Sequence, residues 1–73
     1  MGRLCYFVNE AITAEDGQLI VCIAEEGMKG YRKTDWFWGK DYERASMLAD
    51  KQNEKMGISQ NEAWKIIAST MNW

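Results

Sequence analysis

The sequence predicts an α+β fold in which a three-stranded antiparallel sheet is followed by a helical hairpin, in the order β-β-β-α-α. Before residue 40, apolar residues come in short runs with β-branched and aromatic members, broken by glycine, which is typical of strands and turns. After residue 40, apolar residues recur at helical spacing. A chain of 73 residues has room for one domain, which we expect to span residues 1–73.

The first two strands are expected at residues 3–8 and 18–24. The second run, QLIVCIA, is continuously apolar rather than alternating. Both faces of such a strand are usually covered, so we expect it at the centre of the sheet.

A turn at Asp16-Gly17 is expected to join these strands, because a type I′ turn needs positive φ at both central residues. Ile12 would then face Val21. A turn centred about three residues earlier would instead place Cys5 opposite Cys22, since the turn fixes the register. We expect the first of these two registers.

The third strand is expected at residues 30–34, GYRKT, which is short and cationic, as exposed edge strands tend to be. The run TDWFWG then leads to the first helix. Thr34 or Asp35 is expected to bond to backbone amides two or three residues on, which would organise a turn or a 3₁₀ step. Trp36 and Trp38 would point the same way in an extended segment and would diverge in a tight turn.

The first helix is expected from Asp41 to about residue 56. Gly57 is placed to end it in a left-handed conformation, with Ile58 as the hydrophobic partner of that cap. The predicted apolar face comprises Tyr42, Ala45, Leu48, Ala49, Gln52 and Met56.

The second helix is expected to begin with a capping box, SQNE, in which Ser59 caps the helix and Glu62 reaches back. Its apolar stripe is wide enough to contact the sheet and the first helix, or a partner. The stripe comprises Trp64, Ile67, Ala68 and Met71, and it is widened by Ala63 and Ile66.

The sequence lacks most of the residues and motifs that are typical of enzyme active sites. The chain has no histidine, the commonest general base and metal ligand, and its glycines are scattered rather than grouped in a phosphate loop. Cys5 and Cys22 lie in apolar runs, which predicts reduced core residues rather than a metal site or a nucleophile. We therefore expect no enzyme activity, no catalytic residues, no metal and no cofactor.

The charge and hydropathy of the chain limit the classes of partner that we expect. A net charge of −2 is too weak to indicate nucleic-acid binding from bulk charge. No apolar run approaches the roughly 18 residues of a membrane span, and the N-terminal residues lack the layout of a signal peptide. We expect a cytoplasmic protein that does not contact a membrane.

The centre of the chain carries the candidate binding site. So small a fold cannot bury all of its four tryptophans without crowding, so we expect at least one ring of the run to stay exposed. The expected aromatic-basic patch comprises Tyr31, Arg32, Lys33, Trp36, Trp38 and Lys40. Trp, Tyr and Arg dominate protein–protein hot spots, and we interpret the patch as the docking site for a protein partner.

Two further interactions are expected. Aromatic rings among cations also stack bases and track phosphates, so the alternative is a single-stranded nucleic-acid-binding protein that uses the same patch with Lys29. The end of the last helix offers a surface for weak self-association through Ile66, Thr70 and Trp73.

The segment GYRKTDWFWG resembles small uncharacterised bacterial proteins associated with phages and integrative mobile elements. The matching residues are Gly30, Tyr31, Thr34, Asp35, Trp36, Trp38 and Gly39. The resemblance implies a genomic setting rather than a mechanism. In that setting we expect a small accessory protein that modulates host machinery, for example by inhibiting a nuclease defence complex.

Overall fold

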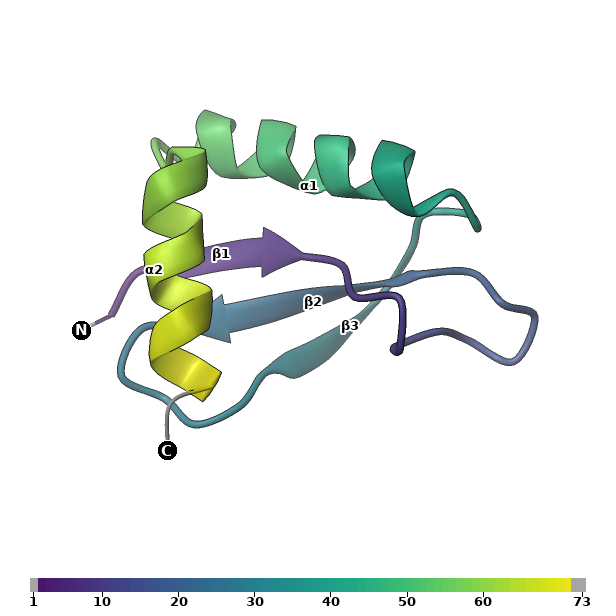
Figure 1. Cartoon of the computed structure of the whole chain (residues 1–73), viewed down its shortest axis with the longest axis horizontal. Coiled ribbons are helices and arrows are strands. Elements are labelled where there is room, and N and C mark those ends of the chain that lie inside the picture. Colours follow the sequence, from purple (N-terminus) through teal and green to yellow (C-terminus); the bar gives the residue numbers. More distant parts are fainter. Residues whose placement is uncertain (1, 72–73) are drawn as a thin grey trace.

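The predicted element order is present in the computed structural model, which describes residues 2–71. The elements are β1 (Leu4–Phe7), β2 (Ile20–Glu25), β3 (Arg32–Phe37), α1 (Tyr42–Lys55) and α2 (Gln60–Met71). The strands form one antiparallel sheet with β2 at its centre (Figure 1). The α+β class and the central position of the second strand are thus confirmed.

The turn between β1 and β2 lies where it was predicted, but its type differs. The amide of Gly17 donates to the carbonyl of Ala14 at 2.9 Å, and Gly17 has φ 88°. Asp16 does not have positive φ, so the predicted type I′ turn is wrong. A tight turn followed by a left-handed glycine is the common three-residue hairpin loop.

The register of this hairpin matches neither expected pairing. Cys5 pairs with Ala24 in the regular part of the ladder, whereas Thr13 pairs with Leu19 near the turn. The two parts are offset by a local turn at Asn9. Its side-chain oxygen accepts from the amide of residue 11, and its carbonyl accepts from the amide of residue 12, both at 2.9 Å. Asparagine favours such turns. This turn accommodates extra residues in the first arm of the hairpin, which a regular hairpin would not contain.

Strand β3 is longer than predicted and contains an irregularity. Lys33 pairs with Cys22, whereas Phe37 pairs with Ile20, so β3 has extra residues between these two positions. Trp36 and Phe37 therefore belong to the sheet, as their aromatic character favours, and Trp38 follows directly after the strand. The expectation that the whole WFW run follows the third strand is wrong.

Thr34 holds this irregularity together. Its hydroxyl donates to the carbonyl of Val21 at 2.7 Å and accepts from the amide of Trp36 at 3.1 Å. The expected bond from residue 34 to an amide two residues on is confirmed. It stabilises a bulge in a strand rather than a turn or a 3₁₀ step.

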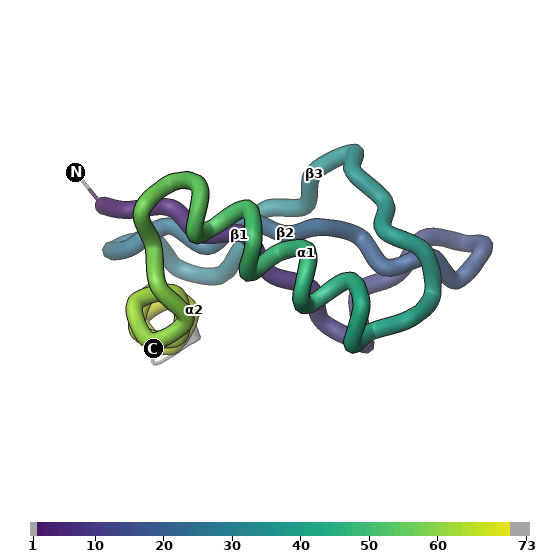
Figure 2. Tube along the Cα trace, turned by 90° about the horizontal axis from the view of Figure 1, so that it is seen from above, coloured from purple at the N-terminus to yellow at the C-terminus, as the bar shows by residue number. Residues whose placement is uncertain are grey.

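The two helices cover different parts of the sheet. Helix α2 lies on one side of the sheet, and α1 runs along the β1 edge (Figures 1 and 2). Helix α1 therefore does not lie over the face that α2 covers. It contributes Ala45 to the packing on the opposite face, and no described helix lies across the rest of that face.

Helix α1 closes the edge of β1 with an asparagine. Asn53 is only 2% exposed. Its side-chain nitrogen donates to the carbonyl of Tyr6 at 2.9 Å, and its side-chain oxygen accepts from the amide of Tyr6 at 2.7 Å. The side chain thus takes the place of a neighbouring strand and satisfies part of an open edge. The buried positions Ala45 and Ala49 were predicted, and Asn53 was not.

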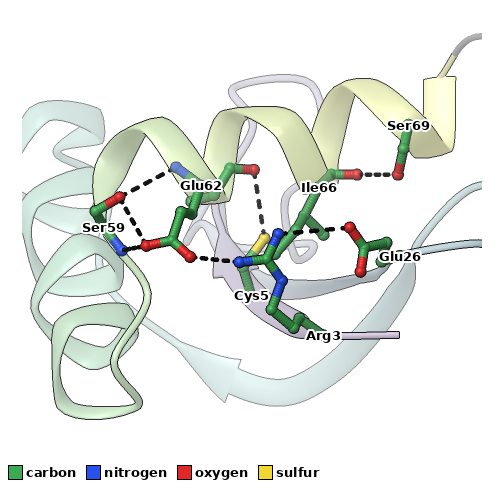
Figure 3. Close-up of polar contacts among 8 residues, drawn as sticks. Arg3, Cys5, Glu26, Ser59, Glu62, Ile66 and Ser69 are labelled. Carbon is green, nitrogen blue, oxygen red and sulfur yellow. Dashed lines mark hydrogen bonds and ion pairs between the residues drawn. The ribbon is translucent and has the colours of Figure 1, made fainter. Parts of the chain in front are cut away.

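The junction between the helices follows the prediction. Gly57 has φ 80°, and the amide of Ile58 donates to the carbonyl of Asn53 at 2.9 Å, as in a Schellman cap. The amide of Glu62 donates to the hydroxyl of Ser59 at 3.2 Å, and the Glu62 carboxylate accepts from the amide of Ser59 at 3.4 Å (Figure 3). The second oxygen of Glu62 pairs with Arg3, which ties α2 to the start of the chain.

The buried stripe of α2 differs from the predicted one. Ala63, Ile66 and Thr70 are buried, whereas Trp64 is 70% exposed and Ala68 is exposed. Because α2 has the sheet on one side only, its outer positions have nothing to pack against. Since Ile66 and Thr70 are inside, they are not available for the predicted self-association surface, and Trp73 lies outside the described residues.

The core lies on both faces of the sheet. Toward α2, a cluster includes Cys5, Phe7, Cys22 and Ile66. On the opposite face, a smaller cluster of Val8, Leu19, Val21 and Ala45 packs with Tyr6 and Trp38. The prediction of free, buried cysteines is confirmed, and burial raises the pKa of the Cys5 thiol to about 11.

Candidate functional site

The residues of the predicted aromatic-basic patch lie on different faces of the sheet. Cross-strand partners share a face. Lys33 pairs with Cys22, whose side chain belongs to the core beneath α2. Arg32 pairs with Ile23, and Ile23 pairs with Tyr6, so these three side chains form a row on the opposite face. Lys33 and Arg32 therefore point to opposite sides of β3.

Tyr31 lies on the α2 side with Lys33. Its ring meets the ring of Phe7 edge-on, with centroids 5.9 Å apart, and Phe7 belongs to the core cluster under α2. Tyr31 is therefore separated by the sheet from the tryptophans with which it was grouped.

Trp36 and Trp38 meet on the sheet face opposite α2. Their ring centroids are 4.5 Å apart, and the Trp36 ring meets Tyr6 edge-on at 6.0 Å. The two indoles point the same way, as expected for an extended segment. We call Tyr6, Trp36 and Trp38 the open-face cluster. Tyr6 was missed because only the sheet register brings it beside residues thirty positions later.

Backbone pairing fixes the position of this cluster. The amide of Trp38 donates to the carbonyl of Leu19 at 3.0 Å, and the amide of Leu19 donates to the carbonyl of Gly39 at 2.7 Å. The Trp38 ring is half-buried against the second core cluster, and Trp36 is 38% exposed. Trp38 therefore acts mainly as a support, and Trp36 presents the accessible ring.

Lys40 lies at the far end of the sheet, beside the first hairpin. A Cβ atom added at Gly17 would lie 3.5 Å from Cε of Lys40. Hydrogen bonds from Gln18 chiefly, and the charge of Lys40 to a smaller extent, hold the pKa of Asp16 below its usual range. Of the six residues predicted for the patch, the structure brings together Arg32, Trp36 and Trp38 on one face.

Arg32 is a charged neighbour of the open-face cluster, because it lies in the same cross-strand row as Tyr6. The Arg32 guanidinium lies 3.3 Å from Glu25, and its side chain is 65% exposed. Such an exposed pair is weak, about 0–1 kcal/mol, so Arg32 can exchange Glu25 for another acceptor at small cost. Leu4 adds a further exposed apolar side chain to this face, since it alternates with Cys5 along β1.

The described residues contain neither a candidate metal site nor a candidate membrane-spanning helix. Among residues 2–71, no three histidine, cysteine, aspartate or glutamate side chains lie close enough together to hold a metal ion. None of the helices in that part of the chain has the length and apolar character needed to cross a membrane.

Comparison with known protein families, with curated proteins and with solved structures finds no match to this chain.

Proposed function

We propose that this protein is a non-enzymatic binding module that docks a protein partner through the open-face cluster and Arg32. The single observation that carries the proposal is the position of Trp36, which is 38% exposed beside Tyr6 on the sheet face opposite α2. A large ring fixed on a rigid strand loses little conformational freedom on binding, which favours its use as an anchor.

The surroundings of Trp36 suit a protein interface. Interface centres are enriched in aromatic residues and arginine and are surrounded by polar groups. Here Tyr6 and Trp38 hold the central ring by edge-on contacts, and Arg32 supplies an exposed guanidinium. An apolar partner surface with a carboxylate at its margin would complement this arrangement.

The same geometry favours a protein partner over single-stranded nucleic acid. Stacking a base needs an accessible ring face, whereas the Trp36 ring is only 38% exposed and packs against both Tyr6 and Trp38. Tyr31 and Lys33 point to the other side of the sheet, so the six residues do not form one continuous track for a phosphate backbone.

The setting of the partner is also a proposal. On the resemblance of GYRKTDWFWG to proteins of phages and mobile elements, we place the partner in host machinery such as a nuclease defence complex. We propose the cytoplasm as the compartment, because two free buried cysteines are compatible with a reducing environment.

Affinity capture from bacterial lysate tests this proposal. The wild type is compared with a Trp36→Ala, Arg32→Glu double variant, with Met47→Ala as the control, because Met47 is a large apolar side chain of α1 that is 62% exposed. We expect the wild type and the control to retain a partner protein that the double variant loses. All three proteins should show a cooperative thermal unfolding transition, which establishes that they are folded. If the folded double variant retains every partner, the open-face cluster is not the docking site.

A fluorescence titration tests the nucleic-acid alternative. We expect no quenching of tryptophan emission by single-stranded oligonucleotides at low salt. Quenching that weakens as salt rises, and that the Trp36→Ala substitution removes, would favour the alternative.

A further inference from the structure

A groove lies beside the two helices and shares Tyr6 with the open-face cluster. It has a volume of about 430 Å³ and is lined by residues of α1 and α2, the two helices that meet at an angle in Figure 1, and by residues 6–10 at and beyond the end of β1. Each helix presents one stripe to it at helical spacing, which includes Tyr42 and Asp50 from α1 and Gln60 and Trp64 from α2.

The walls of this groove are aromatic and accessible. Trp64 is 70% exposed, the highest value among the large apolar side chains of residues 2–71, and Tyr42 is 39% exposed. Exposed aromatic side chains that line a hollow are typical of binding sites rather than of ordinary surface.

The charge of the groove has one sign. Its ionised side chains are the carboxylates of Glu10 and Asp50, and none of the described residues that line it is lysine or arginine. The side-chain nitrogen of Gln60 donates to Asp50 at 3.2 Å, which links the two helices and holds this carboxylate in the wall. Arg32 and Lys33 are exposed cations, but both belong to β3. Because β3 contributes no residue to this groove, these two cations do not line it.

We propose that this groove binds an arginine-bearing apolar segment of a partner protein. The guanidinium fits the observations best, because it pairs with carboxylates through its planar fork and also stacks on aromatic faces. Asp50 and Glu10 supply the carboxylates, and Trp64 supplies the ring. The apolar lining residues Ala49, Ala63 and Ile67 contact the neighbouring side chains of the segment. The proposal rests on charge complementarity, and Trp36, Trp38 and Arg32 take no part in it because they do not line the groove.

Peptides that differ only in charge test this proposal. The probes are acetyl-Ala-Leu-Arg-Leu-Ala-amide and its counterparts with citrulline or glutamate in place of arginine, titrated into the ¹⁵N-labelled full chain. We expect the arginine peptide to shift the indole N–H signal of Trp64 and the amide signals of Asp50 and Gln60. The citrulline peptide should bind about 2- to 5-fold more weakly, as the loss of one exposed charge pair implies, and the glutamate peptide more weakly still.

Two substitutions separate a site from a general charge effect. Asp50→Asn should weaken the arginine peptide by about 2- to 5-fold and leave the citrulline peptide unchanged. The matched control Asp35→Asn removes the same charge from β3 and should change neither. Trp36→Ala should also leave the titration unchanged, so that failure of the groove and failure of the open-face cluster can be told apart.

Three results would overturn the proposal. The first is equal binding of the three peptides, and the second is an equal effect of Asp50→Asn and Asp35→Asn. The third is self-association: if groove signals shift with protein concentration alone, and sedimentation shows a dimer that Trp64→Ala dissociates, the occupant is a second copy of this chain.

Discussion

Replacing Asn53 tests how the sheet edge is held. The Asn53→Ala substitution removes two hydrogen bonds, of 2.7 and 2.9 Å, from the backbone of Tyr6. Each unsatisfied group costs about 1–3 kcal/mol when it is buried, and the half-buried setting of Tyr6 lets water recover part of that cost. Alanine regains only a few tenths of a kcal/mol through helix propensity. We therefore expect a loss of about 2–4 kcal/mol.

That loss is comparable to the whole stability of the fold, since a domain of this size has only about 3–5 kcal/mol from its core. Urea unfolding followed by circular dichroism measures it, and Asn61→Ala, at an exposed position of α2, is the matched control. The Asn53→Asp variant keeps the shape but loses the donor at neutral pH, so it should also be destabilised. A loss below about 1 kcal/mol for Asn53→Ala would refute the view that this side chain completes the sheet.

Four further substitutions probe the helix junction and two titrating groups. Gly57→Ala forces a Cβ into φ 80° and should cost about 1–2 kcal/mol in urea unfolding, whereas Gly57→Asn should cost less. Burial raises the pKa of Cys5 from 9.0 to about 11, so its contribution to stability is complete below pH 9 and is lost as the pH rises through 11. The wild type should lose about 2–3 kcal/mol more than Cys5→Ala over that interval. Hydrogen bonds from Ser59, and then the charge of Arg3, hold the pKa of Glu62 below its ordinary value of 4.5. Its contribution is therefore present above that value, and the stability difference between wild type and Glu62→Gln should shrink as the pH falls further; an unchanged difference would contradict this.

Features encoded by neighbouring residues could be predicted from the sequence. The left-handed cap at Gly57 and the capping box of Ser59 and Glu62 depend on contacts within a few positions, and both are present. The central strand was recognisable because a strand covered on both faces has no polar side chains in alternation.

Features that depend on distant residues could not be predicted. The register of the first hairpin follows from the turn at Asn9, and the closure of β1 depends on Asn53, which lies 47 positions from Tyr6. The exposure of Trp64 follows from the absence of a layer outside α2 within the described chain, which helical spacing alone does not reveal.

The candidate site, too, could be predicted only in part from neighbouring residues. Sequence proximity grouped Tyr31 and Lys33 with Trp36, but alternation along a strand sends neighbouring side chains to opposite faces. The irregularity at Thr34 adds two residues to β3 between Lys33 and Phe37, which keeps the alternation, so Lys33 and Trp36 face opposite sides. Only the pairing of β3 with β2 identifies which aromatic and basic residues share a surface.

Light-induced cross-linking at position 36 tests the central claim most directly. A benzoyl-phenylalanine residue replaces Trp36 in one variant and Asn61, an exposed residue of α2, in another, and both are irradiated in bacterial cells. We predict a discrete cross-linked protein from position 36 that position 61 does not give and that Arg32→Glu weakens. Cross-linking from position 36 that is no greater than from position 61, in a variant that remains folded, would contradict the assignment of the open-face cluster as a docking surface.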